Sequence, residues 1–184
     1  CTPRSVSLTW TPVRPLPYET LAIRHHPMPA PDTAASSTTA LRAQGQSLWL
    51  DYIRRSLMTS GRLQRLIEED HLRGLTSNPA IFQKAIGGSD EYDEAIAAFL
   101  GENPEMDAGE IYERLAVEDI RRAADILRPV YDETGIDGVV SLEVSPHLAH
   151  DTEGTIEEAR RLWDAVDRPN LMIKVPATDE GIPA

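Results

Sequence analysis

A lysine within an apolar run is the residue of this sequence best suited to covalent chemistry. Lys174 lies between Ile173 and Val175, and the chain has only two lysines among its 18 basic residues. A lysine on a strand is ordinarily a surface residue whose aliphatic stem covers apolar neighbours. An amine partly removed from water keeps more of its neutral form, however, and can condense with a carbonyl group to form a Schiff base. The sequence therefore makes Lys174 a candidate nucleophile. The other lysine, Lys84, lies in a polar stretch and is expected to be a solvated helix residue.

Other polar residues occupy the same position as Lys174 in their own apolar runs. Strands are expected at residues 47–53, 74–77, 139–144 and 171–175. Because side chains alternate across a strand, each run has one apolar face and one face with a polar group near its C-terminal end. These groups belong to Asp51, Thr76, Asn78, Glu143 and Lys174, and Ser141 shares the face of Glu143.

The C-terminal ends of strands form the active site of a β/α barrel. We therefore expect these polar side chains to share one site. Asp51 and Glu143 would then supply the proton transfers that carbinolamine formation, C–C cleavage and hydrolysis require.

Helical patterns separate the four predicted strands. Helices are expected at 60–70 with a cap near Ser60, at 80–86, 90–100, 109–133 and 152–167. Asn78-Pro79 suits the start of a helix, and Gly135 suits the end of one. The acidic run from Asp90 to Glu94 is interpreted as a solvated helix start. Alternation of strand and helix is typical of parallel βαβ units, so the fold class is predicted to be α/β.

Two further motifs are open to a functional reading. His147 and His150 could form a metal pair, but no third ligand is evident, which favours loop or helix-capping roles. No metal site is therefore predicted. Trp49 and Trp163 are expected to be packing residues rather than platforms for a ligand.

Composition separates residues 1–46 from the rest. This segment holds seven of the 14 prolines and four arginines against two acids, although the whole chain carries a net charge of -12. It is predicted to be disordered or extraneous, and a leader resembling a transit peptide, a linker or a mistranslated upstream stretch all remain open. The acidity belongs to residues 47–184.

Charge and hydropathy exclude several classes of partner. An acidic chain without a basic cluster is not expected to bind nucleic acid. The single cysteine, Cys1, excludes an internal disulfide framework. No apolar run approaches the roughly 18 residues that a membrane span needs, so we expect no membrane association and a cytoplasmic location.

Four stretches of the sequence resemble the transaldolase family and occur in that family's order. They are SLWLDYI (47–53), GLTSNPAIF (74–82), VSLEVSPHLAHDTEGTI (140–156) and LMIKVPAT (171–178). The resemblance covers 47–184 and implies a (β/α)8 TIM barrel of the class I aldolase type, truncated after the fourth strand. Residues 47–184 would then be the N-terminal half of a transaldolase barrel, which on its own is expected to be inactive.

The resemblance also implies a reaction and a role for each candidate residue. A transaldolase moves a dihydroxyacetone unit from a ketose phosphate to an aldose phosphate in the pentose phosphate pathway, without a cofactor. The implied substrates are sedoheptulose 7-phosphate, fructose 6-phosphate, glyceraldehyde 3-phosphate and erythrose 4-phosphate. Lys174 would form the Schiff base, Asp51 would act in C–C cleavage, and Glu143 would act with a water. Thr76 and Asn78 would line the pocket, with Asn78 holding a substrate hydroxyl.

Three alternatives remain. The wording around SLWLDYIRRSL (47–57) and LRPVYDETG (127–135) is similar to bifunctional enzymes in which a transaldolase is fused to glucose-6-phosphate isomerase. An aldolase of the same superfamily would release free dihydroxyacetone. A non-catalytic half-barrel binding module is the third alternative. The sequence does not indicate an oligomeric state.

Overall fold

The computed structural model describes residues 37–184, in which four strands alternate with helices. The strands are β1 (Leu48–Asp51), β2 (Leu72–Thr76), β3 (Val139–Glu143) and β4 (Leu171–Lys174). The helices are α1 (Ser37–Ala43), α2 (Arg55–Thr59), α3 (Arg62–Glu69), α4 (Pro79–Gly87), α5 (Asp93–Glu102), α6 (Ala108–Thr134), the short 3₁₀ helix η1 (Pro146–Leu148) and α7 (Thr152–Val166). The prediction of a disordered or extraneous segment at 1–46 lies outside the described residues, except that 37–46 include helix α1.

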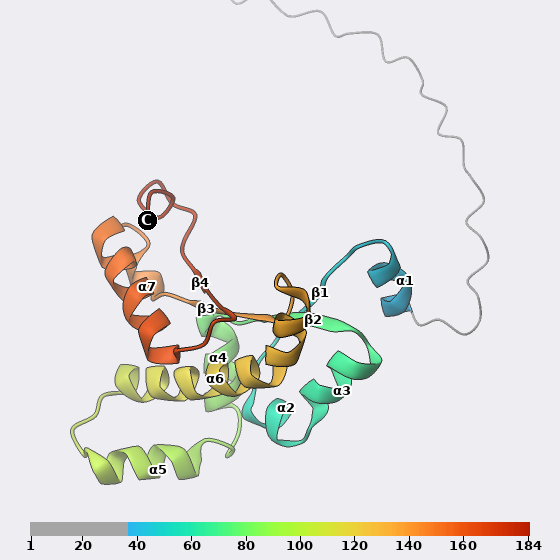
Figure 1. Cartoon of the computed structure of the whole chain (residues 1–184). Helices are drawn as coiled ribbons and strands as arrows, with labels where there is room; N and C mark the ends of the chain where they lie inside the picture. The colour runs from blue at the N-terminus through green and yellow to red at the C-terminus, as the bar shows by residue number, and fades with distance from the viewer. Residues whose placement is uncertain (1–36) are drawn as a thin grey trace, which may run out of the picture. The chain divides into compact units, whose positions relative to one another are not determined.

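The four strands form one parallel sheet in which spatial order equals chain order, β1-β2-β3-β4 (Figure 1). Helical segments connect each strand to the next, as parallel neighbours require. This arrangement confirms the predicted α/β class and the four predicted strands. Strand β2 begins at Leu72, two residues before the predicted start, because the pairing with β1 extends back to Leu48 through a register shift.

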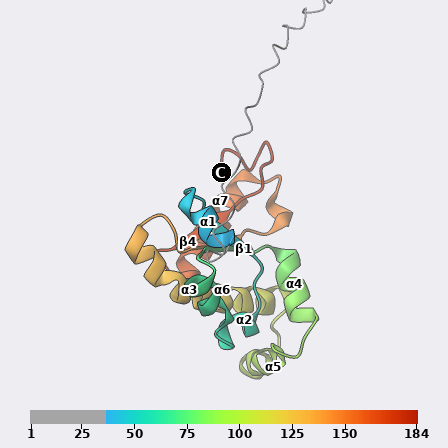
Figure 2. The ribbon, with the colours of Figure 1, turned by 90° about the vertical axis from the view of Figure 1, so that its right-hand side faces the viewer.

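Helices cover one face of the sheet and bury its apolar side chains. Val140, Leu142 and Val144 of the β3 segment are at most 4% exposed. They belong to a core that also contains Phe82 of α4 and Ile120 of α6. Figure 1 shows α2, α3, α4 and α6 below the strands, and Figure 2 shows the same layer from the side. Full burial of one such side chain stabilises a fold by about 1.5–3 kcal/mol, so this layer fixes which face of each strand turns inward.

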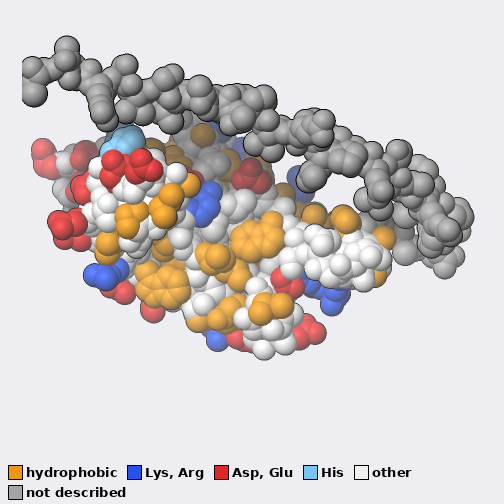
Figure 3. Space-filling view, turned by 90° about the horizontal axis from the view of Figure 1, so that it is seen from above, with side chains coloured by type: hydrophobic (Ala, Val, Ile, Leu, Met, Phe, Trp, Pro, Cys, Tyr) orange, Lys and Arg blue, Asp and Glu red, His pale blue; other side chains and the backbone are white. Residues whose placement is uncertain are grey.

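The opposite face of the sheet carries the polar residues of the strands and two exposed apolar ones. Trp49 of β1 is 37% exposed and Met172 of β4 is 50% exposed. The indole of Trp49 also lies against Gly74, where a Cβ atom would come within 2.4 Å of the ring. Trp49 is thus a packing residue, as expected, while Trp163 is 45% exposed on α7. The space-filling view shows apolar side chains exposed between charged ones on the upper face (Figure 3).

Helix α6 spans 27 residues and has well-defined ends. Asp107 and Glu110 form a reciprocal capping box, each accepting the other's backbone N–H at 2.9 Å. Gly135 ends the helix at φ 69°, which confirms the prediction for this residue. None of the helices within residues 37–184 combines the length and hydrophobicity that crossing a bilayer requires.

Two glycines in the turn between α6 and β3 are expected to differ in how much stability their replacement by alanine costs. Gly135 and Gly138 both have positive φ, 69° and 78°, but a Cβ at Gly135 would meet nothing within 4 Å. A Cβ at Gly138 would lie 2.3 Å from the backbone nitrogen of Tyr131. Gly135→Ala should therefore lower the free energy of unfolding by about 1–2 kcal/mol, and Gly138→Ala by a further 1–3 kcal/mol or so. Urea unfolding of the two variants measures the difference, and equal losses would contradict the steric argument.

The helix expected at 60–70 is α3, Arg62–Glu69, and a separate short helix, α2, comes directly before it. Ser60 does not start a helix: it ends α2, where its N–H donates to the carbonyl of Ser56. Gly61 then adopts φ 70° and precedes α3. The left-handed conformation of Gly61 separates the two helices, so the cap predicted near Ser60 is the adjacent Gly61, and the Ser60 side chain does not form it.

The acidic run Asp90–Glu94 is only partly a solvated helix start. Asp93 and Glu94 do lie in the first turn of α5, but Tyr92 is completely buried. Glu91 forms an ion pair with Arg54 at 2.6 Å and accepts the N–H of Ser56 at 2.8 Å. Glu91 therefore binds the α4–α5 connection to the segment that follows β1. This contact corrects the prediction that the whole run is a solvated helix start.

A buried polar cluster, Arg55–Tyr92–Asp119, lies at the centre of this connection. Asp119 of α6 has no exposed surface, and its carboxylate accepts from Arg55 Nε at 3.0 Å and from the Tyr92 hydroxyl at 2.8 Å. The Tyr92 oxygen in turn accepts the backbone N–H of Arg55 at 3.0 Å. Burial raises the pKa of both Asp119 and Tyr92. The cluster joins three segments that lie far apart in the sequence.

Candidate active site

The C-terminal ends of the four strands bring the predicted site residues to one edge of the sheet. Backbone pairing sets Asp51 of β1 opposite Thr76 of β2, and Thr76 opposite Ser141 of β3. Two residues further along β3, Glu143 pairs with Lys174 of β4. Because paired residues of adjacent strands point the same way, these side chains share the face that the helices leave open.

Lys174 contacts two of the predicted residues. Its Nζ atom lies 3.1 Å from Oε2 of Glu143 and 3.5 Å from Oγ1 of Thr76. The lysine side chain is 40% exposed and the Glu143 side chain 26% exposed. The amine is thus held beside a carboxylate and a hydroxyl while it remains accessible to a small molecule.

Asn78 and Asp51 lie at the same edge but outside this contact. The side-chain oxygen of Asn78 caps helix α4 by accepting the N–H of Ile81 at 2.9 Å, a use that leaves its amide nitrogen free of the cap. Asp51 is exposed at the end of β1. Within residues 37–184, no hydrogen bond or ion pair joins either residue to Lys174, so the structure brings together Lys174, Glu143 and Thr76 only.

The chain is similar both to a family model and to individual proteins of one family. The family model described as transaldolase/fructose-6-phosphate aldolase matches residues 48–184. A transaldolase of Thiobacillus denitrificans is 52% identical over 141 residues, which are 76% of this chain and 39% of that protein. Transaldolase 2 of Nostoc punctiforme is 49% identical over 145 residues, 78% of this chain and 38% of that protein.

The chain belongs to the transaldolase/fructose-6-phosphate aldolase family. A transaldolase of Saccharopolyspora erythraea is also similar, with 49% identity over 152 residues, 83% of this chain and 41% of that protein. The chain spans about two fifths of the length of the curated relatives it matches. The TIM-barrel aldolase fold goes with this family, and the four parallel strands are consistent with part of such a barrel.

Ser141 is a polar residue that contacts Thr76 and was not among the predicted site residues. It is 3% exposed, and its hydroxyl donates to Oγ1 of Thr76 at 2.8 Å. Strand parity placed it on the face of Glu143, but serine is common on strands and carries no charge to mark it. Only the pairing of β2 with β3 reveals that it meets Thr76.

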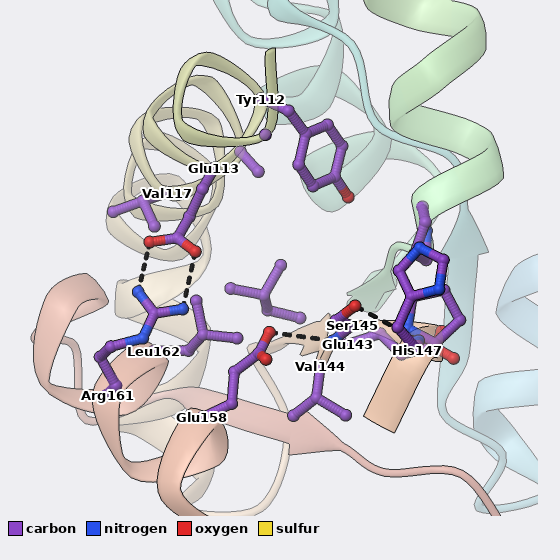
Figure 4. Close-up of a pocket in the computed structure, with 15 residues that line it drawn as sticks. Tyr112, Glu113, Val117, Glu143, Val144, Ser145, His147, Glu158, Arg161 and Leu162 are labelled. Carbon is purple, nitrogen blue, oxygen red and sulfur yellow. Dashed lines mark hydrogen bonds and ion pairs between the residues drawn. The ribbon is translucent and has the colours of Figure 1, made fainter. Parts of the chain in front are cut away.

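A pocket of about 440 Å³ lies on the other side of Glu143, between helices α6 and α7. Figure 4 shows Tyr112, Glu113 and Val117 of α6 facing Glu158, Arg161 and Leu162 of α7. Arg161 closes one side by donating to both oxygens of Glu113, with Nη2 at 2.7 Å from Oε2. Glu158 accepts the backbone N–H of Ser145 at 2.9 Å. Local sequence patterns do not reveal this pocket, because the residues of its walls come from segments some 48 residues apart.

Tyr112 and Arg161 both have raised pKa values in this pocket, Arg161 because of its hydrogen bonds to Glu113. Burial, followed by the nearby carboxylates of Glu143, Glu113 and Glu158, raises the pKa of Tyr112 to about 12. The phenol therefore keeps its proton near neutral pH. It can donate a hydrogen bond in the pocket but cannot act as a base there.

The two histidines make separate contacts. His147 is exposed in η1, and its backbone N–H donates to the Ser145 hydroxyl at 3.3 Å. Nδ1 of His150 lies 3.0 Å from Oε2 of Glu180, a contact that lowers the pKa of Glu180. Across residues 37–184, no group of three or more potential metal ligands is found.

Proposed function

We propose that this chain carries the Schiff-base centre of a transaldolase, which transfers a dihydroxyacetone unit from a ketose phosphate to an aldose phosphate. Fructose 6-phosphate and sedoheptulose 7-phosphate are the proposed donors, and glyceraldehyde 3-phosphate and erythrose 4-phosphate the acceptors, in the pentose phosphate pathway. The observation that carries the proposal is the amine of Lys174, accessible yet 3.1 Å from Glu143, at the C-terminal edge of a parallel sheet in a transaldolase-family chain.

The reaction begins with attack of the neutral Lys174 amine on the ketone carbon. A C–N bond forms, the carbonyl oxygen takes up a proton, and the carbinolamine loses one water to give the protonated imine. Glu143 is the proposed acid and base for these proton transfers because its carboxylate is the group next to Nζ.

C–C cleavage then uses the imine as the electron sink. Asp51 removes the proton of the C4 hydroxyl, the C3–C4 bond breaks, and an aldose phosphate leaves while the enamine stays on Lys174. The enamine carbon attacks the aldehyde of the acceptor, and the addition of one water to the new imine releases the product and regenerates the amine. Thr76 contacts Nζ directly, and the amide nitrogen of Asn78 is the proposed donor to a substrate hydroxyl.

Borohydride trapping tests the proposal. The complete gene product that carries this chain is incubated with fructose 6-phosphate and borohydride, and the labelled peptide is mapped by mass spectrometry. A reduced adduct on Lys174 is expected, and an adduct on another residue or none would contradict the proposal. Sugar transfer is then measured with and without an aldose phosphate acceptor. Turnover that needs no acceptor would identify the aldolase alternative instead.

Substitution of Asp51 is expected to stop the reaction after imine formation. With Asp51→Asn, transfer should fall by about 10²-fold or more, because a positioned acid or base contributes about that much. The trapped adduct should persist but change in mass, from the three-carbon unit to the whole ketose phosphate. Glu153→Gln, which changes an exposed carboxylate of α7, is the control. A three-carbon adduct in Asp51→Asn would show that another group performs the cleavage.

A further inference from the structure

Ser141 has a buried hydroxyl that contacts a side chain of the reactive site. It lies in the middle of β3, is 3% exposed, and directs its only polar side-chain atom at Oγ1 of Thr76, 2.8 Å away. Thr76 in turn lies 3.5 Å from the amine of Lys174. Three strands thus contribute one group each to a row that ends at Nζ.

The bond to Ser141 restricts what Thr76 can do. A hydroxyl has one proton to donate and two lone pairs that accept. The Ser141 hydroxyl, at 2.8 Å, occupies one of these three hydrogen-bonding positions of Thr76. Nζ of Lys174, at 3.5 Å, is the other partner of the Thr76 hydroxyl within residues 37–184. The Thr76 oxygen can therefore accept from the charged amine, and its O–H can donate to the neutral one.

A neighbouring serine also links the two strands. Ser77 is completely buried, and its hydroxyl donates to the backbone carbonyl of Ser141 at 2.8 Å. This bond links the segments of β2 and β3 at the same level as the Ser141–Thr76 bond. It involves no side chain of the proposed site. Comparing variants of the two serines therefore distinguishes an effect on the pairing of the strands from an effect on the position of the Lys174 amine.

We propose that Ser141 is a positioning residue for the Schiff-base amine: it orients the hydroxyl of Thr76, which holds Nζ of Lys174 in line with the carbonyl carbon. The inference rests on the proposed function of Lys174. Its effect falls on condensation, in which the C–N bond forms and one water is released. Loss of the alignment lowers the fraction of amines in attacking geometry and slows that step.

The test compares Ser141→Ala with Ser77→Ala in the complete gene product. Each variant removes one buried hydroxyl bond, so similar shifts in melting temperature are expected. The rate of borohydride-trapped adduct formation with fructose 6-phosphate should fall about five- to tenfold in Ser141→Ala, as for one hydrogen bond, and stay within about twofold of wild type in Ser77→Ala. Ser141→Thr, which keeps the hydroxyl, should restore most of the rate.

A double-substitution cycle tests whether Ser141 influences the amine through Thr76. If Ser141 acts through Thr76, the variant Ser141→Ala/Thr76→Val should form the adduct no more slowly than Thr76→Val alone. If the fold-loss in the rate of adduct formation of the double variant equals the product of the two single losses, the inference is overturned. An unchanged rate in Ser141→Ala, or an equal loss of rate in Ser77→Ala, would also overturn it. Ser141→Cys, which has nearly the same volume and a weak donor, replaces the alanine variant if the latter does not fold.

The outcomes also separate the inference from the proposed function. Absence of any adduct in the unsubstituted protein overturns the proposed function, and the inference with it. An adduct on Lys174 whose rate is insensitive to Ser141 overturns the inference alone.

Discussion

Replacing Lys174 by methionine is expected to abolish the borohydride-trapped adduct and to lower sugar transfer by at least about 10⁴-fold. Removal of a residue that forms the covalent intermediate has losses of this order or greater. Methionine keeps the length and apolar stem of the side chain but has no amine. The ion pair that it removes is partly exposed, with side chains 40% and 26% accessible. The free energy of unfolding should therefore change by no more than about 1 kcal/mol.

Two further variants make the Lys174 result specific. Lys174→Arg keeps a cation beside Glu143 but cannot form an imine under these conditions, so it should be as inactive as the methionine variant. Lys84→Met removes the other lysine, which is exposed on α4 as predicted, and should retain both the adduct and the transfer. Substantial transfer by Lys174→Arg would show that charge, rather than covalent chemistry, is what the reaction needs at this position.

Replacing Asp119 by alanine is expected to lower the free energy of unfolding by about 3–5 kcal/mol, the range for breaking a buried ion pair from one side. The carboxylate has no exposed surface and is the partner of both Arg55 Nε and the Tyr92 hydroxyl. Its removal leaves a guanidinium that is only 12% exposed with Glu118 as its remaining carboxylate, at 3.1 Å. The Tyr92 hydroxyl would lose its acceptor in a buried site.

Urea unfolding compares this loss with that of matched variants. Asp125→Ala breaks a solvent-exposed pair with Arg168 and should cost less than about 1 kcal/mol. Tyr92→Phe removes one of the two donors and should cost about 1–3 kcal/mol. Because burial raises the pKa of Asp119, the neutral isostere in Asp119→Asn should be tolerated better than alanine. A loss in Asp119→Ala as small as that in Asp125→Ala would mean that the cluster contributes no more than a surface pair.

Strand periodicity was sufficient to predict that Lys174, Glu143 and Thr76 lie on one face of the sheet. Lys174, Glu143 and Thr76 each follow or lie between apolar residues, and alternation along a strand is a local property that the sequence shows directly. Parallel pairing then brings their side chains to one face, as predicted. The same reasoning identified the end of α6 at Gly135, because a glycine after a long amphipathic segment can adopt the left-handed conformation.

Contacts between distant segments could not be predicted in this way. Glu91 and Tyr92 looked like part of a solvated acidic run, and nothing nearby in the sequence indicates that Tyr92 meets an aspartate 27 residues later. Ser141 and Thr76 are 65 residues apart, and the register that joins them depends on how two strands pair. A single residue can also redirect a helix, as Gly61 does between α2 and α3. These features depend on tertiary packing, which local patterns do not encode.

The coincidence of spatial order with chain order has a consequence for how the reactive site is assembled. A strand leaving the ribosome can pair at once with the strand made just before it, so no strand has to be inserted between two others. Asp51 is made first, then Thr76, then Ser141 and Glu143, so we expect the amine of Lys174 to reach partners that have already paired. Synthesis of β4 is thus the step that completes the contact, and hydrogen exchange on ribosome-bound chains of increasing length would show protection spreading from β1 to β4.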